Sequence, residues 1–392
     1  MTSEWHEVPL RELVGYISKG IAPSYAEEAS ESTIRVLNQK CNRNFRISYG
    51  DSRLHDTRKK KVPPERYVKP DDILINSTGA GTAGRIAQIE DVPSATTIDG
   101  HMILIRSNGK VTQKFLGYAL KAHQWEVLQL DEGSTGQTEL NRDRLLDEIM
   151  INYPVSLDEQ NAIVGTLESI DRKLIVNEQL NDNLQQQAAA LFSSLYDRTN
   201  TEVRFTDLIQ ILGGGTPKTG ENTYWNGNIA FFTPKDVGTP YTLSTEKTIT
   251  EEGLSHCNSR LYPVNTVFVT ARGTVGKVGM SGVPMAMNQS CYALVGKETH
   301  QLLVYFYTLK TVDRLKHKAS GAVFDAITTR DFESEQIMKL SDEDAKSFLC
   351  IAAPMFQKVL DNGIENQRLS TLRDSLLPKL MSGEIDVSAV QL

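Results

Sequence analysis

The sequence predicts an α+β protein built from two similar modules, each followed by a long helix, with the two helices packed on each other. Three observations carry this prediction. At 392 residues the chain is long enough for two or three domains, its second half repeats its first, and a heptad pattern follows each repeat. Hydrophobic residues make up 40% of the chain, which supplies several cores and excludes a disordered polypeptide.

The internal repeat is visible when the sequence is shifted against itself by about 195 positions. Residues 34–40 then match residues 229–235, and later matches follow in the same order with small changes of offset. Near the end of each copy, Arg142-Asp143 corresponds to Arg330-Asp331. Chance can supply any one match, but the shared order indicates a duplicated unit of about half the chain.

Each copy begins with a module of mixed secondary structure. Residues 1–152 and 199–338 contain short β-branched runs separated by Gly, Pro, Asn and Asp, a pattern typical of strands and turns. One or two helices are expected near residues 114–130 and 302–317. Both modules are therefore predicted to be α+β domains.

A long helix is predicted after each module, within residues 153–198 and 339–392. Each opens with a capping signal, a serine three positions before an acidic residue: Ser156 with Glu159, and Ser341 with Asp344. Seam residues then recur at spacings of four and three: Ile163, Leu167, Ile170, Leu174, Asn177, Asn181, Leu184, Ala188, Leu191 and Leu195, and Phe348, Ala352, Met355, Val359, Asn362, Asn366, Leu369, Arg373 and Leu376. Pro378 is expected to end the second helix.

The two seams are expected to pack on each other as a coiled coil. Helices of about 33 residues would be about 50 Å long at 1.5 Å per residue, so the pair would also act as a spacer. Asparagines at corresponding points of both seams are expected to pair and fix the register: Asn177, Asn181, Asn362 and Asn366. Ordinary amphipathic core helices are the simpler alternative, but the matching caps and asparagines favour the paired helices.

Charge is distributed unevenly along the chain. The net charge of −7 argues against binding nucleic acid through bulk charge. Residues 34–69, however, hold eleven basic and three acidic side chains, interleaved with Asn and Gln. Cations can hold phosphates and amides can read bases, so this segment is a candidate DNA-binding surface. A solvated basic loop is the competing interpretation, and a solvated helix face is the favoured one for the basic run at 310–318.

No catalytic or metal site is expected in this chain. The four cysteines lie far apart, which favours reduced thiols over a zinc site, and the lack of a signal peptide or membrane-length apolar run predicts a cytoplasmic protein without membrane contact. Gly79, Gly81 and Gly84 superficially fit a dinucleotide-binding loop, but no helix follows, so they are interpreted as a turn between two strands. No amino-methyltransferase motif or nuclease cluster is present, so methyl transfer would belong to a partner, and no cofactor is expected.

Several motifs together resemble the specificity subunit of type I restriction–modification systems. The second module carries Gly215-Thr216-Pro217, Tyr224-Trp225, Thr233-Pro234-Lys235-Asp236, residues 272–276, Asn288-Gln289, Ser320-Gly321 and Thr329-Arg330-Asp331. In the first module, residues 134–138 match the family's later loop. That module has Ala29-Ser30 in place of the Tyr-Trp pair, so its target would differ.

The resemblance implies a non-catalytic, sequence-specific subunit that binds double-stranded DNA. Each module would be a target-recognition domain that reads one half of a bipartite asymmetric target. The helices would form an antiparallel coiled coil, relate the halves by a pseudo-two-fold axis and dock two methyltransferase (modification) subunits, and restriction or translocase subunits would join this core. The alternative is a coiled-coil scaffold whose two modules bind peptide or RNA.

The candidate DNA-binding residues combine the basic segment with the family motifs. They are Arg35, Asn38, Lys40, Arg43, Arg58, Lys59, Lys60, Thr135, Gln137 and Arg142 in the first module, and Thr216, Lys218, Trp225, Lys235, Arg272, Asn288, Gln289, Ser320 and Arg330 in the second. Lys40 and Lys235 occupy equivalent positions after a strand, and Arg142 and Arg330 occupy equivalent positions before the final strand. For the two arginines, ion pairs with aspartates of their own module are the competing interpretation.

Overall fold

The computed structural model describes residues 4–79, 81–132, 139–238, 240–318 and 326–387. The chain divides into two compact units. The first comprises Met1–Lys173 with Leu369–Leu392, and the second comprises Leu174–Arg368. Each unit therefore contains one module together with parts of both long helices.

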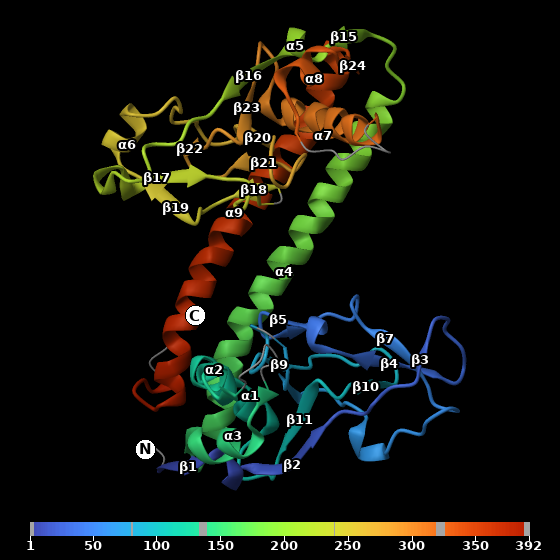
Figure 1. Cartoon of the computed structure of the whole chain (residues 1–392), viewed down its shortest axis with the longest axis vertical. Helices are drawn as coiled ribbons and strands as arrows, with labels where there is room; N and C mark the ends of the chain where they lie inside the picture. Colours follow the sequence, from blue (N-terminus) through green and yellow to red (C-terminus); the bar gives the residue numbers. More distant parts are fainter. Residues whose placement is uncertain (1–3, 80, 133–138, 239, 319–325, 388–392) are drawn as a thin grey trace. The chain divides into compact units, whose positions relative to one another are not determined.

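In the first unit, the strands form small sheets of mixed direction (Figure 1). One antiparallel sheet has the order β2 (Val14–Lys19), β11 (Met102–Ser107), β8 (Ile73–Asn76) and β9 (Ile86–Gln88). Another has the order β10 (Thr96–Ile98), β4 (Thr33–Leu37), β7 (Arg53–Asp56) and β3 (Tyr25–Ala26), with β10 and β4 parallel. Shorter pairs join β1 (Trp5–Pro9) to β14 (Met150–Pro154), β5 (Asn42–Arg43) to β6 (Arg46–Ile47) and β12 (Asp131–Glu132) to β13 (Glu139–Leu140).

Helices of the first unit pack beside the beginning of the first long helix (Figure 1). They are α1 (Gln113–Ala122), α2 (Gln124–Leu128) and α3 (Arg142–Glu148), with 3-10 turns η1 (Leu10–Glu12), η2 (Gln39–Cys41) and η3 (Pro64–Arg66). Side-chain caps fix two of the starts, because Thr112 accepts the amide of Phe115 and Asn141 accepts the first amides of α3. The buried face of α1 joins the main core of the unit through Phe115, Leu116 and Leu120.

The second unit repeats this arrangement. One sheet has the order β16 (Ile209–Gly213), β23 (Cys291–Gly296), β20 (Val267–Thr270), β21 (Val278–Ser281) and β18 (Tyr241–Thr242). Another has the order β19 (Lys247–Ile249), β17 (Trp225–Phe232) and β22 (Met285–Met287), and β15 (Glu202–Arg204) pairs with β24 (Gln336–Met338). The helices are α5 (Phe205–Leu208), α6 (Glu251–Ser255), α7 (Gln301–Lys318) and α8 (Thr329–Glu333), with the 3-10 turn η4 (Asn222–Tyr224).

The predicted duplication is confirmed by the matching topology. In each unit, the first long strand pairs with the strand that precedes the module helix: β2 with β11, and β16 with β23. On its other side, that second strand pairs with the first strand of a hairpin, β8–β9 in one unit and β20–β21 in the other. Both units also contain a parallel pair, β4 with β10 and β17 with β22, at equivalent places in the repeat. The helices expected near 114–130 and 302–317 are present as α1 with α2, and as α7.

The two long helices are α4 (Leu157–Tyr196) and α9 (Asp342–Met381), each 40 residues long. At 1.5 Å per residue each would span about 60 Å, more than the length expected from the seams. The predicted caps are confirmed: the amide of Glu159 donates to Ser156 Oγ over 3.3 Å, and the amide of Asp344 donates to Ser341 Oγ over 3.0 Å.

The prediction that Pro378 ends the second helix is wrong, because α9 continues to Met381. A proline removes one helical hydrogen bond, but its own carbonyl still accepts, here from the amide of Ser382 over 3.0 Å. Leu380 and Met381 are buried in the core of the first unit. Their burial offsets the lost hydrogen bond and keeps the last turn helical.

Within the second unit, the seam asparagines pair between α4 and α9, as predicted. Asn177 Nδ2 donates to Asn366 Oδ1 and Asn362 Nδ2 donates to Asn181 Oδ1, each over 2.8 Å. Partner numbers fall on α9 as they rise on α4, so the helices run antiparallel here. Asn177 and Asn362 are buried, and an interior amide that lacks its partner is costly, so these pairs disfavour a shifted register.

In the first unit, a charged cluster surrounds one seam position of α9, that of Arg373. Asp171 of α4 accepts from Arg373 of α9 over 3.0 Å, from Lys121 of α1 over 3.2 Å and from the Tyr118 hydroxyl over 2.9 Å. This explains why an arginine occupies a seam position.

Across all described residues, no helix has the length and apolar character needed to cross a membrane.

Candidate nucleic-acid interface

In the first unit, hydrogen bonds gather several loops at one edge of the sheets. The amide of Asp99, after β10, donates to the carbonyl of Leu37 at the end of β4 over 2.9 Å. Thr78, in the loop between β8 and β9, contacts Gln39 of η2 over 3.5 Å and His101 of the β10–β11 turn over 2.7 Å. Polar segments that are far apart in the sequence therefore share one surface.

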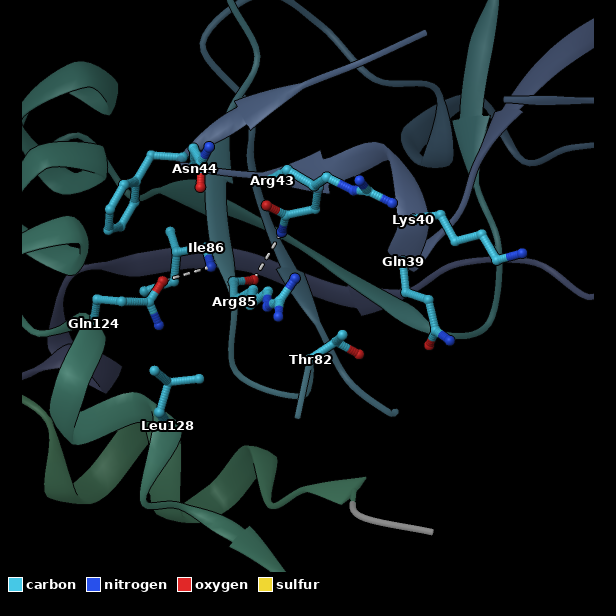
Figure 2. A pocket seen from close by; sticks show the side chains of 11 residues that line it. Gln39, Lys40, Arg43, Asn44, Thr82, Arg85, Ile86, Gln124 and Leu128 are labelled. Atoms are coloured by element: carbon cyan, nitrogen blue, oxygen red, sulfur yellow. Dashed lines mark hydrogen bonds between the residues drawn. The ribbon is translucent and has the colours of Figure 1, made fainter. Parts of the chain in front are cut away.

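A cleft of about 600 Å³ opens beside these loops (Figure 2). The hairpin formed by β5 and β6 lies on one side, and the β8–β9 loop with helix α2 lies on the other. The described residues that line it include three cations and no acidic side chain. They are Gln39, Lys40, Asn42, Arg43, Asn44, Phe45, Thr82, Arg85, Ile86, Gln124 and Leu128. The lining therefore attracts anions.

Two amide side chains fix the walls of this cleft. Asn42 is buried, and its Nδ2 donates to the carbonyl of Arg85 over 2.8 Å and to Asn76 Oδ1 over 3.2 Å. Gln124 accepts the amide of Ile86 over 2.9 Å and donates to the carbonyl of Gly84 over 2.8 Å. These bonds, two of which are drawn in Figure 2, hold the hairpin, the loop and α2 together before any ligand arrives.

The glycine-rich segment is a turn between strands β8 and β9, as predicted. Gly79, Gly81 and Gly84 all have positive φ, which a glycine adopts without steric cost. A side chain at Gly84 would lie 2.9 Å from the carbonyl oxygen of Val127, so the loop packs closely on α2. A strand follows this turn where a dinucleotide site would need a helix.

Some of the predicted DNA-binding residues of the first module line the cleft, whereas others form hydrogen bonds within the module. Lys40 and Arg43 both line the cleft. Asn38 instead holds a turn, because it accepts the amide of Lys40 over 2.9 Å and donates to the carbonyl of Asp51 over 2.8 Å. Arg35 donates to Ser52 Oγ over 3.0 Å from within β4.

The basic run that follows β7 lies outside the lining of the cleft. Arg58 pairs with Asp56 over 3.2 Å, and this hydrogen-bonded pair lowers the pKa of Asp56 and raises that of Arg58. Lys60 donates to the carbonyl of Ala22 over 2.8 Å, and Lys59 is exposed. Thr135, Gln137 and Ser320 lie outside the described residues.

The second unit gathers the equivalent loops. The hydroxyl of Thr216 bonds Gln289, and the amide of Asn288 donates to the carbonyl of Phe232 over 3.0 Å. The amide of Arg272 donates to the carbonyl of Ser290 over 3.3 Å. These bonds bring Thr216, Arg272, Asn288 and Gln289 to one edge, and Lys235 follows β17 as Lys40 follows β4.

Two other predicted residues of the second unit contact each other, and a third forms an ion pair. Trp225 donates through Nε1 to the carbonyl of Lys218 over 3.2 Å. Lys235 forms an exposed ion pair with Glu246 over 3.8 Å. In the basic run at 310–318, Arg314 and Lys318 both pair with the buried carboxylate of Glu335, so those two charges stabilise the unit itself.

Arg142 and Arg330 lie in the first turn of equivalent helices, α3 and α8, and both are exposed. Among the described residues, neither arginine forms an ion pair with an aspartate of its own module. Asp143 lies 3.7 Å from Arg11, and Asp331 accepts from Thr328. Both guanidinium groups therefore face solvent.

Sequence reasoning missed several residues of the cleft. Arg85, Thr82 and Gln124 come from segments that the basic run does not include, and they reach the cleft only through the fold. For Gln39 and Asn44, the sequence offers only their place among the amides of the basic segment. The one sequence signal for Arg85 is its position directly after the glycine turn.

Across the described residues, no group of His, Cys, Asp and Glu could hold a metal ion.

Two copies of one module, each with polar loops gathered at an edge and each followed by a long paired helix, define a duplicated recognition protein. A family profile described as type I restriction modification DNA specificity domain matches residues 2–186 and again 198–341. The chain therefore belongs to this family, and the resemblance inferred from its motifs is confirmed.

Curated relatives agree with this assignment. The MjaIX type I restriction enzyme specificity subunit of Methanocaldococcus jannaschii is 27% identical over 171 residues, covering 42% of this chain and 38% of that protein. The HindI specificity subunit of Haemophilus influenzae is 28% identical over 185 residues, covering 46% and 40%. The chain thus spans about two fifths of the length of the curated relatives it matches.

A solved structure supports the fold. The S subunit of a type I restriction–modification system from M. genitalium aligns over 97% of this chain and 96% of its own length, with a TM-score of 0.63 and 16% identity. At this identity the likeness concerns the fold alone.

Proposed function

We propose that the chain is the non-catalytic DNA-recognition subunit of a type I restriction–modification complex, in which each module reads one half of a bipartite asymmetric target. The observation that carries this proposal is the double match to a DNA specificity domain, at residues 2–186 and 198–341. The cationic cleft of the first unit supports it, because phosphate contacts supply much of the affinity for DNA.

The proposed partners are double-stranded DNA, two methyltransferase subunits docked on the helices, and restriction or translocase subunits. The sequence supports this division of labour, since it contains no amino-methyltransferase motif. The proposed functional parts are recognition domains at 1–152 and 199–338, with helical spacers at 153–198 and 339–392. The complex would act in the cytoplasm, where its DNA target is accessible.

The alternative, a coiled-coil scaffold whose modules bind peptide or RNA, finds no support among the relatives. They are named as specificity subunits of type I restriction enzymes.

A fluorescence anisotropy assay tests the proposal. The full chain, assembled with its methyltransferase subunits, is titrated with labelled duplexes that carry or lack a target selected from a random pool. Specific binding is expected to exceed non-specific binding by about a thousandfold or more, and to survive added salt better. Equal affinity for all duplexes at every salt concentration would contradict the proposal.

A further inference from the structure

The hairpin formed by β5 and β6 distinguishes the first module from the second. It pairs Asn42 with Ile47 and Arg43 with Arg46, and the chain reverses at Asn44 and Phe45. In the described part of the second unit, the corresponding stretch between β17 and β20 contains β18, β19 and α6 instead. Any contact made by this hairpin therefore belongs to the first module alone.

The tip of the hairpin is held in one conformation. Asn44 and Phe45 have φ of 52° and 61°, a left-handed backbone that asparagine tolerates and a bulky aromatic residue disfavours. Phe45 is kept there because its ring packs against the main core, with Lys121 Nζ 5.0 Å from the ring centre. At the base of the hairpin, the buried hydrogen bonds of Asn42 add a second anchor.

This anchored hairpin presents two exposed side chains, Arg43 and Asn44. Neither side chain has a hydrogen-bond or ion-pair partner among the described residues, although both line the cationic cleft (Figure 2). Arginine pairs with two acceptors of guanine, and asparagine pairs with the donor and acceptor of adenine. The major groove of DNA is wide enough to admit a two-stranded ribbon.

The rest of the cleft suits the DNA backbone. Lys40 follows β4, and Arg85 is held near the glycine turn, where its Nη2 donates to the carbonyl of Gly81 over 2.9 Å. A flexible ammonium and a guanidinium on the far wall can hold phosphates beside the groove that the hairpin enters.

We propose that the β5–β6 hairpin enters the major groove, that Arg43 and Asn44 determine base specificity for the first half-target, and that Lys40 and Arg85 hold neighbouring phosphates. This inference rests on the DNA-recognition function proposed above. It assigns base reading and backbone binding to different residues of one cleft, so the two roles can be separated by substitution.

Two conservative substitutions test the base-reading role. R43K keeps the positive charge but loses the two-pronged donor, and N44G removes the amide while accepting the left-handed backbone. R11K is the matched control, because it makes the same change in the same module at a guanidinium already paired with Asp147. Each full-length variant, assembled with methyltransferase subunits, selects bound duplexes from a randomised pool that is then sequenced.

R43K and N44G are each expected to weaken the preference at one or two positions of one half-target by roughly ten- to a hundredfold. The other half-target and the R11K control should keep the wild-type preference. The double variant K40A/R85A should instead lower affinity for all duplexes, reduce the salt slope by about 1 to 2 and preserve the preferred sequence.

The inference is overturned if R43K and N44G both retain the wild-type preference at every position of a target that the wild type selects. It is also overturned if R43K behaves like wild type while R43A loses affinity for all duplexes equally, since Arg43 would then contact phosphate. A wild-type complex that selects no sequence at all would instead refute the proposed function itself.

Discussion

Replacing Asp171 by asparagine is expected to destabilise the first unit strongly. Asp171 is the shared acceptor for Arg373, Lys121 and Tyr118, and its side chain is only 19% exposed. D171N would leave two cations, themselves 17% and 12% exposed, without their shared counter-charge. Breaking a buried pair from one side costs about 3–5 kcal/mol, and the partial exposure here favours the lower value, about 3 kcal/mol.

Thermal unfolding followed by circular dichroism measures this loss. For a unit of about 200 residues, 3 kcal/mol corresponds to a fall in Tm of roughly 6–12 °C. The matched control is D374N, because Asp374 also pairs with Arg373 over 2.8 Å but is 64% exposed, so its loss should cost less than about 1 kcal/mol. If D171N lowers Tm no more than D374N does, the cluster does not stabilise the unit.

The same cluster predicts how stability depends on pH. Burial alone would raise the pKa of Asp171, but Lys121, Arg373 and Tyr118 outweigh it, so the pKa lies below its ordinary value. A carboxylate with a lowered pKa contributes stability above its unfolded pKa, about 4, and loses that contribution as the pH falls through the folded pKa. The difference in stability between wild type and D171N should therefore shrink in acid, and a constant difference from pH 7 down to pH 2 would contradict the ion-pair account.

Three further perturbations test other parts of the fold. G84A should cost about 2–3 kcal/mol of unfolding free energy in urea, and more than G81A. Both glycines have positive φ, but only at Gly84 would an added side chain meet a backbone oxygen, at 2.9 Å. Equal losses in the two variants would contradict the packing argument. N181L/N362L removes both halves of one amide pair and should raise Tm slightly while loosening helix register, so a clear fall in Tm would show that the pair itself stabilises the helices. A fragment of residues 1–200 should dimerise through its exposed α4 seam, and sedimentation as a monomer at high concentration would refute this.

Sequence patterns predicted the parts of the fold that depend on local chemistry. The serine caps at Ser156 and Ser341 and the spacing of the seams located α4 and α9, since caps and heptads act within a few residues. The local rule failed at Pro378, where burial of Leu380 in a distant core decides the outcome. Length was also underestimated, because the helices continue beyond the residues that follow the heptad pattern.

The candidate site was harder to predict, because residue type does not reveal which polar groups the fold consumes. Asn38 and Arg35 have the right chemistry for DNA, but the structure uses them to hold a turn and a strand. Arg85 and Gln124 join the cleft from outside the basic segment through tertiary contacts. A charge count finds a basic region, whereas only the fold separates structural cations from available ones.

The division of both long helices between the two units has a consequence for biosynthesis. The second unit is a continuous stretch, Leu174–Arg368, whereas the core of the first unit also needs Leu377, Leu380 and Met381. A chain emerging from the ribosome makes the first module early but can complete its core only after residues 377–381 have been added. A translation product that stops before Leu377 would thus lack residues that the core of its first module needs, so complete folding of that module would report that synthesis has passed Met381.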